Sequence, residues 1–377
     1  MTSRMRTLQI INVRWFNATA WYGLYLASLL RAAGHDSRVV VPRHTLCART
    51  VSEWGFDPIF MDLNTSNPLR LSRTYSQMGR FLKGFRPDIV NCHRGEGFFL
   101  WGLLKKQLAG GPNAFRLVRT RGDQRLPKNT AVNRWLHASV ADAVVATNSV
   151  MARHFTEALH IPPEHVHTIL GGVDTARFAF DAAGRERIRA EFGYGPEHCV
   201  LGLLGRFDEV KGQRELLDAL ASLYHEQELR SVRLLLLGFD SATSQQTVEG
   251  WIQERQLGEV VRITGKRPDV AACLSAVDVG VVASKWSETI ARAALEIMAC
   301  GRPLISTSVG VMPDLLTPDA LFPPADAPAM ARALRRAVTD PAWREALRAE
   351  QQPCIRTLSG ERFLERTLSL YQGLLSS

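Results

Sequence analysis

The chain has 377 residues and a mass of 42.0 kDa, more than one hydrophobic core usually serves, so we expect two domains. Hydrophobic residues make up 46% and charged residues 22%, which is typical of a folded globular protein and excludes a disordered or collagen-like chain. No run of eighteen uncharged apolar residues occurs, and the charged residues 1–6 have no apolar stretch behind them. We therefore expect neither a membrane span nor an exported protein.

The net charge of +9 is unevenly distributed. Residues 1–170 hold 22 Lys+Arg against 10 Asp+Glu, a balance of +12, whereas residues 171–377 hold 24 against 27, a balance of −3. The basic half is expected to meet an anionic partner: nucleic acid, a phosphorylated substrate or an acidic membrane face. The six cysteines are scattered without a C-x-x-C pair or a metal-like spacing to histidine. They are typical of free thiols in a reducing compartment.

Short β-branched runs alternate with helical patterns along the first half. Strands are predicted at residues 8–13, 38–41, 88–93, 115–119 and 143–146, and helices at 21–33, 98–108, 131–140 and 149–159. Residues 171–196 interrupt this pattern and are interpreted as a connection between domains. Strands that alternate with helices predict a parallel, doubly wound sheet.

A second series of the same kind follows the interruption. Strands are predicted at residues 200–204, 233–237, 260–264, 279–282 and 303–306, and helices at 213–227, 244–256 and 291–299. Residues 360–375 carry apolar residues at helical spacing, which predicts a terminal amphipathic helix. We predict domains at 1–170 and 171–355, with residues 356–377 packing back on the first. Each sheet should bind ligands at the carboxyl ends of its strands.

The loop after the first strand of the second series combines glycine with two cations. Gly205 lets backbone approach a ligand, while Arg206 and Lys211 stand beside a predicted helix N-terminus, which itself favours anions. Arginine can grip two phosphate oxygens in a fork, and lysine acts as a point charge. These residue types predict a diphosphate-binding loop.

Two carboxylates follow the strand at 279–282. Glu288 and Glu296 are eight residues apart, so a helix that begins near Glu288 would place both on one face, about two turns apart. The first can accept sugar hydroxyls at the helix N-terminus, and the second can grip a ribose diol. Apolar residues surround Glu296 in the sequence, so we expect it to need a partner.

These motifs carry a resemblance. The second half of the chain resembles the nucleotide-sugar half of the retaining GT-B glycosyltransferases of family 4, of the cell-envelope or lipopolysaccharide type. The motifs that carry this resemblance are, in order, Gly205-Arg206-Phe207 with Lys211-Gly212, then Glu288 and Glu296, then residues 298–305 (Met-Ala-Cys-Gly-Arg-Pro-Leu-Ile). Residues 171–174 (Gly-Gly-Val-Asp) resemble that family's hinge. The resemblance implies two Rossmann-like domains that face a cleft, the first binding the acceptor and the second the nucleotide sugar.

The resemblance also implies a role for each matched residue. Arg206 and Lys211 neutralise the donor diphosphate without a metal ion, and Glu296 binds the ribose. Glu288, with the backbone near Thr289 and Ile290, holds the transferred sugar. The nucleotide base is expected against Lys266 and Arg267, where the sequence departs from the family pattern.

The basic half offers candidates for the acceptor. Arg121 stands where the family has a histidine, and the predicted cleft residues are Asn17, His93, Arg121 and Asp123; His93 has a structural alternative. Arginines that could line the mouth of the cleft are Arg14, Arg94, Arg119, Arg121 and Arg125. Asp142 and Asp278, which precede strands, are interpreted as structural.

We therefore expect a retaining, metal-independent glycosyltransferase that moves a sugar from a nucleoside diphosphate to an anionic glycan or glycolipid, as in lipopolysaccharide or other cell-surface polysaccharide synthesis. It is expected in the cytoplasm, peripherally bound to the inner face of an anionic membrane, and needs no cofactor. The alternatives are a GT-B nucleotide-sugar epimerase and a basic nucleic-acid-binding protein. The sequence lacks Asp-x-Asp, and it lacks the glycine-rich fingerprints of nicotinamide enzymes and ATPases.

Overall fold

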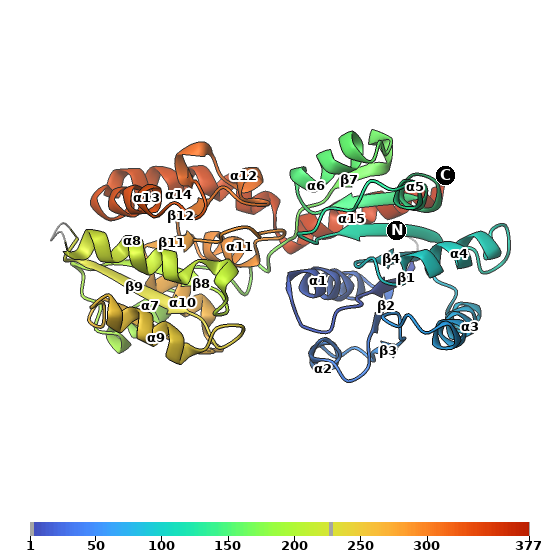
Figure 1. The fold of residues 1–377 in the computed structure, drawn as a ribbon, viewed down its shortest axis with the longest axis horizontal. Coiled ribbons are helices and arrows are strands. Elements are labelled where there is room, and N and C mark those ends of the chain that lie inside the picture. Colours follow the sequence, from blue (N-terminus) through green and yellow to red (C-terminus); the bar gives the residue numbers. More distant parts are fainter. Residues whose placement is uncertain (1–3, 226–228, 377) are drawn as a thin grey trace. The chain divides into compact units, whose positions relative to one another are not determined.

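The computed structural model describes residues 4–225 and 229–376. The chain forms two compact units: unit 1 comprises Met1–Gly171 with Gly360–Ser377, and unit 2 comprises Gly172–Ser359. In each unit helices flank a parallel sheet (Figure 1). The divisions predicted after residues 170 and 355 fall close to those after Gly171 and Ser359. No helix of the described residues combines the length and the apolar character needed to cross a membrane.

In its described residues, unit 1 contains a seven-stranded sheet in the order β3-β2-β1-β4-β5-β6-β7, and every pair is parallel. The strands are β1 (Arg6–Ile10), β2 (Asp36–Val41), β3 (Ile59–Phe60), β4 (Ile89–Cys92), β5 (Arg116–Arg121), β6 (Ala143–Ala146) and β7 (Val166–Thr168). The helices are α1 (Ala18–Ala32), α2 (Leu46–Glu53), α3 (Pro68–Phe85), α4 (Phe98–Leu108), α5 (Ala131–Trp135), α6 (Ser149–Arg153) and α15 (Gly360–Ser376). The strand order reverses between β1 and β4. In open α/β sheets, ligands bind at the carboxyl ends of the two strands that flank such a reversal.

Two apolar clusters cover the faces of this sheet. Leu8 and Ile10 of β1 pack with residues of α3 and α4, whereas Val39 and Val41 of β2 pack with residues of α1 and α2. Strands buried on both faces explain the nearly continuous apolar runs in the sequence.

Helix α15 completes unit 1 from the far end of the sequence, as predicted. The ring centroids of Tyr22 and Phe363 are 4.7 Å apart, and the amide of Asn91 donates to the Tyr371 hydroxyl at 2.9 Å. Gly360 packs so closely on Tyr25 that a Cβ there would lie 2.2 Å from the phenol oxygen. These contacts fix the last helix to α1 and β4.

Unit 2 contains, in its described residues, a six-stranded parallel sheet in the order β10-β9-β8-β11-β12-β13. The strands are β8 (Cys199–Leu204), β9 (Val232–Leu237), β10 (Val261–Ile263), β11 (Val279–Val282), β12 (Leu304–Thr307) and β13 (Leu321–Phe322). The α-helices are α7 (Ala182–Glu191), α8 (Gln213–His225), α9 (Gln245–Glu254), α10 (Val270–Ala276), α11 (Arg292–Ala299), α12 (Met312–Leu315), α13 (Ala327–Thr339) and α14 (Pro341–Thr357). The end of the helix predicted at 213–227 lies outside the described residues.

The structure corrects several predicted elements. Residues 171–196, interpreted as a connection, contain α7, and helices α2, α3, α10, α13 and α14 were not predicted. The strand predicted at 8–13 ends at Ile10, although Ile11 to Val13 stay buried. The helices predicted at 131–140 and 149–159 change after one turn to wider i→i+5 turns. Helix α7 buries only Gly184 and Ile188, so it has too few apolar positions for a pattern to be recognised.

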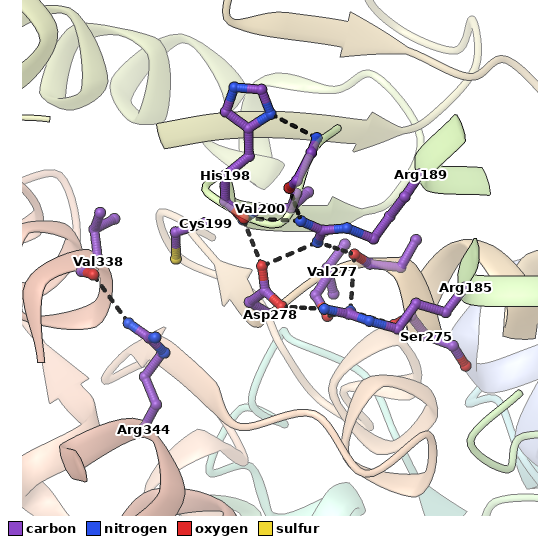
Figure 2. Close-up of polar contacts among 12 residues, drawn as sticks. Arg185, Arg189, His198, Cys199, Val200, Ser275, Val277, Asp278, Val338 and Arg344 are labelled. Atoms are coloured by element: carbon purple, nitrogen blue, oxygen red, sulfur yellow. Dashed lines mark hydrogen bonds and ion pairs between the residues drawn. The ribbon is translucent and has the colours of Figure 1, made fainter. Parts of the chain in front are cut away.

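Asp278 joins three segments at the amino ends of the unit 2 strands (Figure 2). Its carboxylate accepts a hydrogen bond from the backbone N–H of Val200 at 2.8 Å and pairs with Arg185 at 2.6 Å and Arg189 at 3.2 Å. Asp142 does the same in unit 1, where it accepts from Leu117 N–H at 2.7 Å. Both residues are structural, as predicted.

Candidate active site

Three loops of unit 2 meet at the carboxyl ends of β8, β11 and β12. Gly212 has a φ of +69°, and a Cβ there would lie 2.0 Å from the carbonyl oxygen of Ala283. Gly310 has a φ of +60°, and a Cβ there would lie 1.9 Å from the carbonyl oxygen of Glu288, which accepts from Val311 N–H at 2.7 Å. Only glycine satisfies both the backbone angle and the close approach. The loops after the three strands therefore form one rigid constellation.

An ion pair links the first two of these loops. The ammonium of Lys211 donates to Glu288 Oε1 at 2.5 Å, and the Ser284 hydroxyl donates to the same oxygen at 2.5 Å. Glu288 is buried, and the Lys211 side chain is 23% exposed. The sequence placed these two residues in the same site but gave no signal for Ser284 or for their contact.

Arg206 stands at the open side of the same loop. Its guanidinium pairs with Asp208 at 2.7 Å, and its side chain is 41% exposed. Gly205 packs against Lys211, since a Cβ there would lie 3.6 Å from the lysine stem. Both cations are thus balanced by carboxylates that an incoming anion could replace.

Glu288 does not lie on the helix that carries Glu296, contrary to the prediction that both share one helix face. Helix α11 begins at Arg292, because Ala291 adopts the left-handed conformation with φ 51° and ψ 45°. A single left-handed residue redirects the chain, so Glu288 sits in the loop and Glu296 in the helix. No side chain caps the N-terminus of α11. A helix N-terminus without a side-chain cap favours an anion.

Glu296 has a charged partner, as we expected from its apolar neighbours in the sequence. Its carboxylate accepts from Arg292 Nε at 2.6 Å, one turn earlier on α11. Burial raises the pKa of Glu296, against the opposing effect of Arg292 and of Arg177. Neither arginine was predicted as part of this site.

The remaining donor-side candidates differ in what they offer. Lys266 is exposed, with its ammonium 4.8 Å from the ring centroid of Phe239. The Arg267 guanidinium is committed to Glu191 and Asp269, and these bonds raise its pKa. Ile290 is buried at 2% exposure.

Ile290 is buried as a whole residue, so the contact of its backbone with the transferred sugar stays a prediction. Thr289, next to it, is half-buried. Among the described residues, no group of three His, Cys, Asp or Glu side chains could hold a metal ion.

Two of the four acceptor candidates in unit 1 make local structural contacts. Asn17 caps α1 by accepting from Ala20 N–H at 3.0 Å. His93 is fully buried, and its Nε2 lies 2.8 Å from Gln9 Oε1. Burial lowers the pKa of His93 to about 3, with a further contribution from Arg119. His93 is therefore neutral and internal, which corrects its placement at the surface of a cleft.

The other two candidates belong to a cluster of charges at the carboxyl ends of β4 and β5. Asp123 pairs with Arg94 and lies 3.6 Å from both Arg119 and Arg121. Arg94 also pairs with Glu96 at 2.9 Å. Arg119, expected at a surface, is fully buried, while Arg14 and Arg125 are exposed.

Comparison with known proteins covers both units. Residues 20–177 match a family model described as "Glycosyltransferase Family 4", and residues 198–340 match one described as "Glycosyl transferases group 1". A D-inositol 3-phosphate glycosyltransferase of Kineococcus radiotolerans is 28% identical over 67% of this chain and 61% of its own length. The chain spans about half the length of the curated relatives it matches.

Solved structures match over nearly the whole chain. A glycosyltransferase from Rickettsia africae has a TM-score of 0.86 at 18% identity, covering 99% of each chain. Anabaena HepE in complex with UDP and glucose has a TM-score of 0.81 at 16% identity, covering 98% of this chain and 100% of its own. The chain therefore has the GT-B fold, and each of its two halves matches a model of a glycosyltransferase domain.

Proposed function

We propose that the protein transfers a sugar, with retention of anomeric configuration and without a metal ion, from a nucleoside diphosphate to an anionic glycan or glycolipid. The observation that carries this proposal is the constellation of Lys211, Glu288 and Ser284, with Arg206 beside it, at the carboxyl ends of β8 and β11. It places two cations and an uncapped helix N-terminus in one unit, which suits a diphosphate.

The donor reacts by losing its diphosphate, so negative charge grows on the leaving oxygens as the glycosidic bond breaks. Arg206 and Lys211 stabilise that charge once their present partners, Asp208 and Glu288, give way to the phosphates. Glu288 is then free to accept hydroxyls of the transferred sugar, and Glu296 accepts those of the ribose. The acceptor attacks from the face that the diphosphate leaves, and its hydroxyl proton passes to the departing phosphate.

An anionic acceptor is supported by the charge of unit 1 and by the relatives. The names of curated relatives give D-inositol 3-phosphate as the molecule they act on, and one structural neighbour, WaaG, is described as involved in lipopolysaccharide biosynthesis. We extend this to a phosphorylated acceptor at the inner face of the cytoplasmic membrane, in cell-surface polysaccharide synthesis. Each basic residue near an anionic bilayer contributes about 1 kcal/mol.

The first experiment identifies the donor. Thermal unfolding is measured with UDP, GDP, ADP and CMP, because a ligand at a hundred times its Kd stabilises by about 2.7 kcal/mol. The matching nucleotide sugar is then incubated with phosphorylated acceptors, and the anomeric configuration of the product is read by NMR. An inverted product, or an epimerised donor without transfer, contradicts the proposal. When Arg206 or Lys211 is replaced by alanine, the Arg332→Ala variant, which removes one positive charge from the exposed face of α13, serves as the matched control.

A second experiment tests the membrane contact. The full chain is sedimented with phosphatidylglycerol vesicles and with neutral vesicles, at low and at physiological ionic strength. Binding to the anionic vesicles should fall steeply with salt, since screening sets in within about 8–10 Å. Equal, weak sedimentation in all four conditions would assign the positive charge to a soluble acceptor.

A further inference from the structure

The loop after β4 in unit 1 occupies the same topological place as the loop after β11 in unit 2. Strand β4 neighbours β1 at the point where the order of its sheet reverses, and β11 neighbours β8 at the same point of the other sheet. Each of these two strands leads through a short loop into a helix, α4 or α11. Unit 1 therefore repeats the architecture that forms the donor loop in unit 2.

The two helices also share an unusual start. Helix α4 begins after Gly97, which has φ 78° and supplies no side-chain cap, just as α11 begins after the left-handed Ala291. Helices α1, α2, α3, α5 and α6 of unit 1 all have a side-chain cap. The N–H groups at the start of α4 thus lack the side-chain oxygen that their neighbours have. A helix N-terminus of this kind favours an anion.

Three arginines converge beside that helix start. Arg94, Arg119 and Arg121 surround the carboxylate of Asp123, and Glu96 takes a second bond from Arg94. Gly95, in the loop that leads into α4, is exposed and would place a Cβ 3.8 Å from Arg119 Nη2. The cluster therefore spans the carboxyl ends of both β4 and β5.

Two buried donors of this cluster remain unused. Arg119 Nη2 and Arg121 Nε have no hydrogen-bond partner among the described residues, and each lies 3.6 Å from the same Asp123 oxygen. Arg119 is fully buried, and burial lowers the pKa of its guanidinium to about 9, with Arg121 adding to the effect. An unpaired donor on a buried cation is costly. Glu96 pairs with Arg94, and backbone carbonyls accept from Nη1 of Arg119 and Nη2 of Arg121, so Asp123 is the carboxylate near the two donors that stay unpaired.

We propose that this cluster binds a phosphate group of the acceptor, and that Asp123 is the resident anion which the phosphate displaces. The inference rests on the proposed function and names its substrate class. A phosphate presents three oxygens at one point, which matches three guanidinium groups better than the two oxygens of a carboxylate do. No bond is made or broken; the phosphate takes the place that Asp123 now fills, and α4 adds its N–H groups.

The experiment measures binding of inorganic phosphate and of glycerol 3-phosphate to the full chain by calorimetry, with ionic strength held constant by chloride. Arg94→Gln and Arg121→Gln should each weaken binding about tenfold or more, since one charge-assisted bond is lost. Asp123→Asn should strengthen it, because the competing carboxylate is gone. Arg70→Gln, exposed on α3, is the matched control and should bind like the wild type.

Stability provides a second measurement if Asp123→Asn folds poorly. The variant leaves Arg119 without its counter-charge, so phosphate should raise its melting temperature more than that of the wild type. Phosphate binding that is unchanged in all three variants, or no stronger than chloride binding, overturns the proposal. Binding to phosphatidylglycerol vesicles without binding of glycerol 3-phosphate also overturns it, because a phosphodiester has only two non-bridging oxygens and the ligand would then be a lipid headgroup.

The two proposals fail separately. Stabilisation by a nucleoside diphosphate depends on unit 2 and tests the proposed function, whereas phosphate binding that Arg94 and Arg121 control tests this cluster. A protein that responds to UDP but shows no phosphate binding overturns the inference alone. A protein that binds phosphate at Arg121 but responds to no nucleotide overturns the proposed function.

Discussion

The loops after β4 and β11 hold the same place in two sheets but are fixed in different ways. In unit 2, glycines 212 and 310 bring backbone against backbone, so main-chain contacts position these loops in addition to the ion pair of Lys211 with Glu288. In unit 1, side chains do the positioning, with three arginines on Asp123. Main-chain contacts hold a loop whatever its side chains are, whereas the geometry of a side-chain cluster changes with each substitution in it.

The amino ends of the strands, unlike their carboxyl ends, are built in the same way in both units. Asp88, Asp142 and Asp278 each precede a strand and accept a backbone N–H from the neighbouring strand, at 2.7 Å, 2.7 Å and 2.8 Å. The two units therefore share one structural device at the amino ends of their strands and differ at the carboxyl ends. Stability and specificity are separated along the strand direction in both units.

The largest effect is expected from the donor cations. Lys211→Ala and Arg206→Ala should each lower turnover by about a thousandfold, because each removes a contact worth about 3–4 kcal/mol when charge develops on the leaving diphosphate. Initial rates with saturating acceptor provide the measurement. Melting temperatures close to the wild type verify that the fold is intact, and Arg332→Ala should retain full turnover. Wild-type turnover in both variants would remove these residues from the diphosphate site.

Replacing an arginine of unit 1 by alanine tests how the two units differ. Arg94→Ala should raise the KM for a phosphorylated acceptor about tenfold or more and leave kcat nearly unchanged, since it removes binding that the ground state and the transition state share. Steady-state kinetics with both substrates varied separates the two effects. A fall in kcat without a change in KM would place Arg94 in the chemistry instead.

The structural aspartates should behave alike in the two units. Asp142→Ala and Asp278→Ala should each lower the free energy of unfolding by about 3 kcal/mol, because each removes the acceptor of a strand N–H and the carboxylate that pairs with two cations. Urea unfolding followed by circular dichroism measures the loss. Activity of the remaining folded protein should be unaffected, and a variant that is stable but inactive would contradict the separation of roles along the strands.

The smallest effect concerns the pH dependence of donor binding. Burial raises the pKa of Glu296, so on acidification its carboxylate is lost at a higher pH than that of an exposed glutamate, and nucleotide affinity should fall with it. The native state holds this proton more tightly than the unfolded chain does. The contribution of Glu296 to stability is therefore complete below its unfolded pKa and is lost as pH rises through its folded pKa.

Glu296→Gln should bind the nucleoside diphosphate about tenfold more weakly at neutral pH and should lose this pH dependence. Calorimetric titrations at neutral pH and at successively lower pH compare the two proteins. An unchanged affinity would move Glu296 out of the ribose site.

The sequence was sufficient to predict a structural feature where that feature depends on residues that are neighbours along the chain. Short β-branched runs predicted both sheets, and the sequence placed Arg206 and Lys211 in the loop that the structure shows after β8. The need of Glu296 for a partner followed from its apolar surroundings. The break at Ala291 could not be predicted, because nothing in an alanine favours a left-handed conformation.

Contacts between distant segments escaped prediction for a different reason. The bond from Ser284 to Glu288 and the convergence of Arg94 with Asp123 depend on how strands are ordered in a sheet, which local pattern does not encode. The burial of His93 and Arg119 has the same origin. Both lie near strand ends, and their exposure is set by α1, α4 and the neighbouring loops.

The position of α15 has a consequence for biosynthesis. Residues 360–376 leave the ribosome only after all of unit 2, yet they supply Tyr371 as a partner of Asn91 and Phe363 as a partner of Tyr22 in unit 1. During translation unit 2 can reach its final state while the first-made unit still exposes an apolar face on α1. Unit 1 is thus synthesised first but completed last. Helix α1 is accessible to a chaperone while unit 2 is being made.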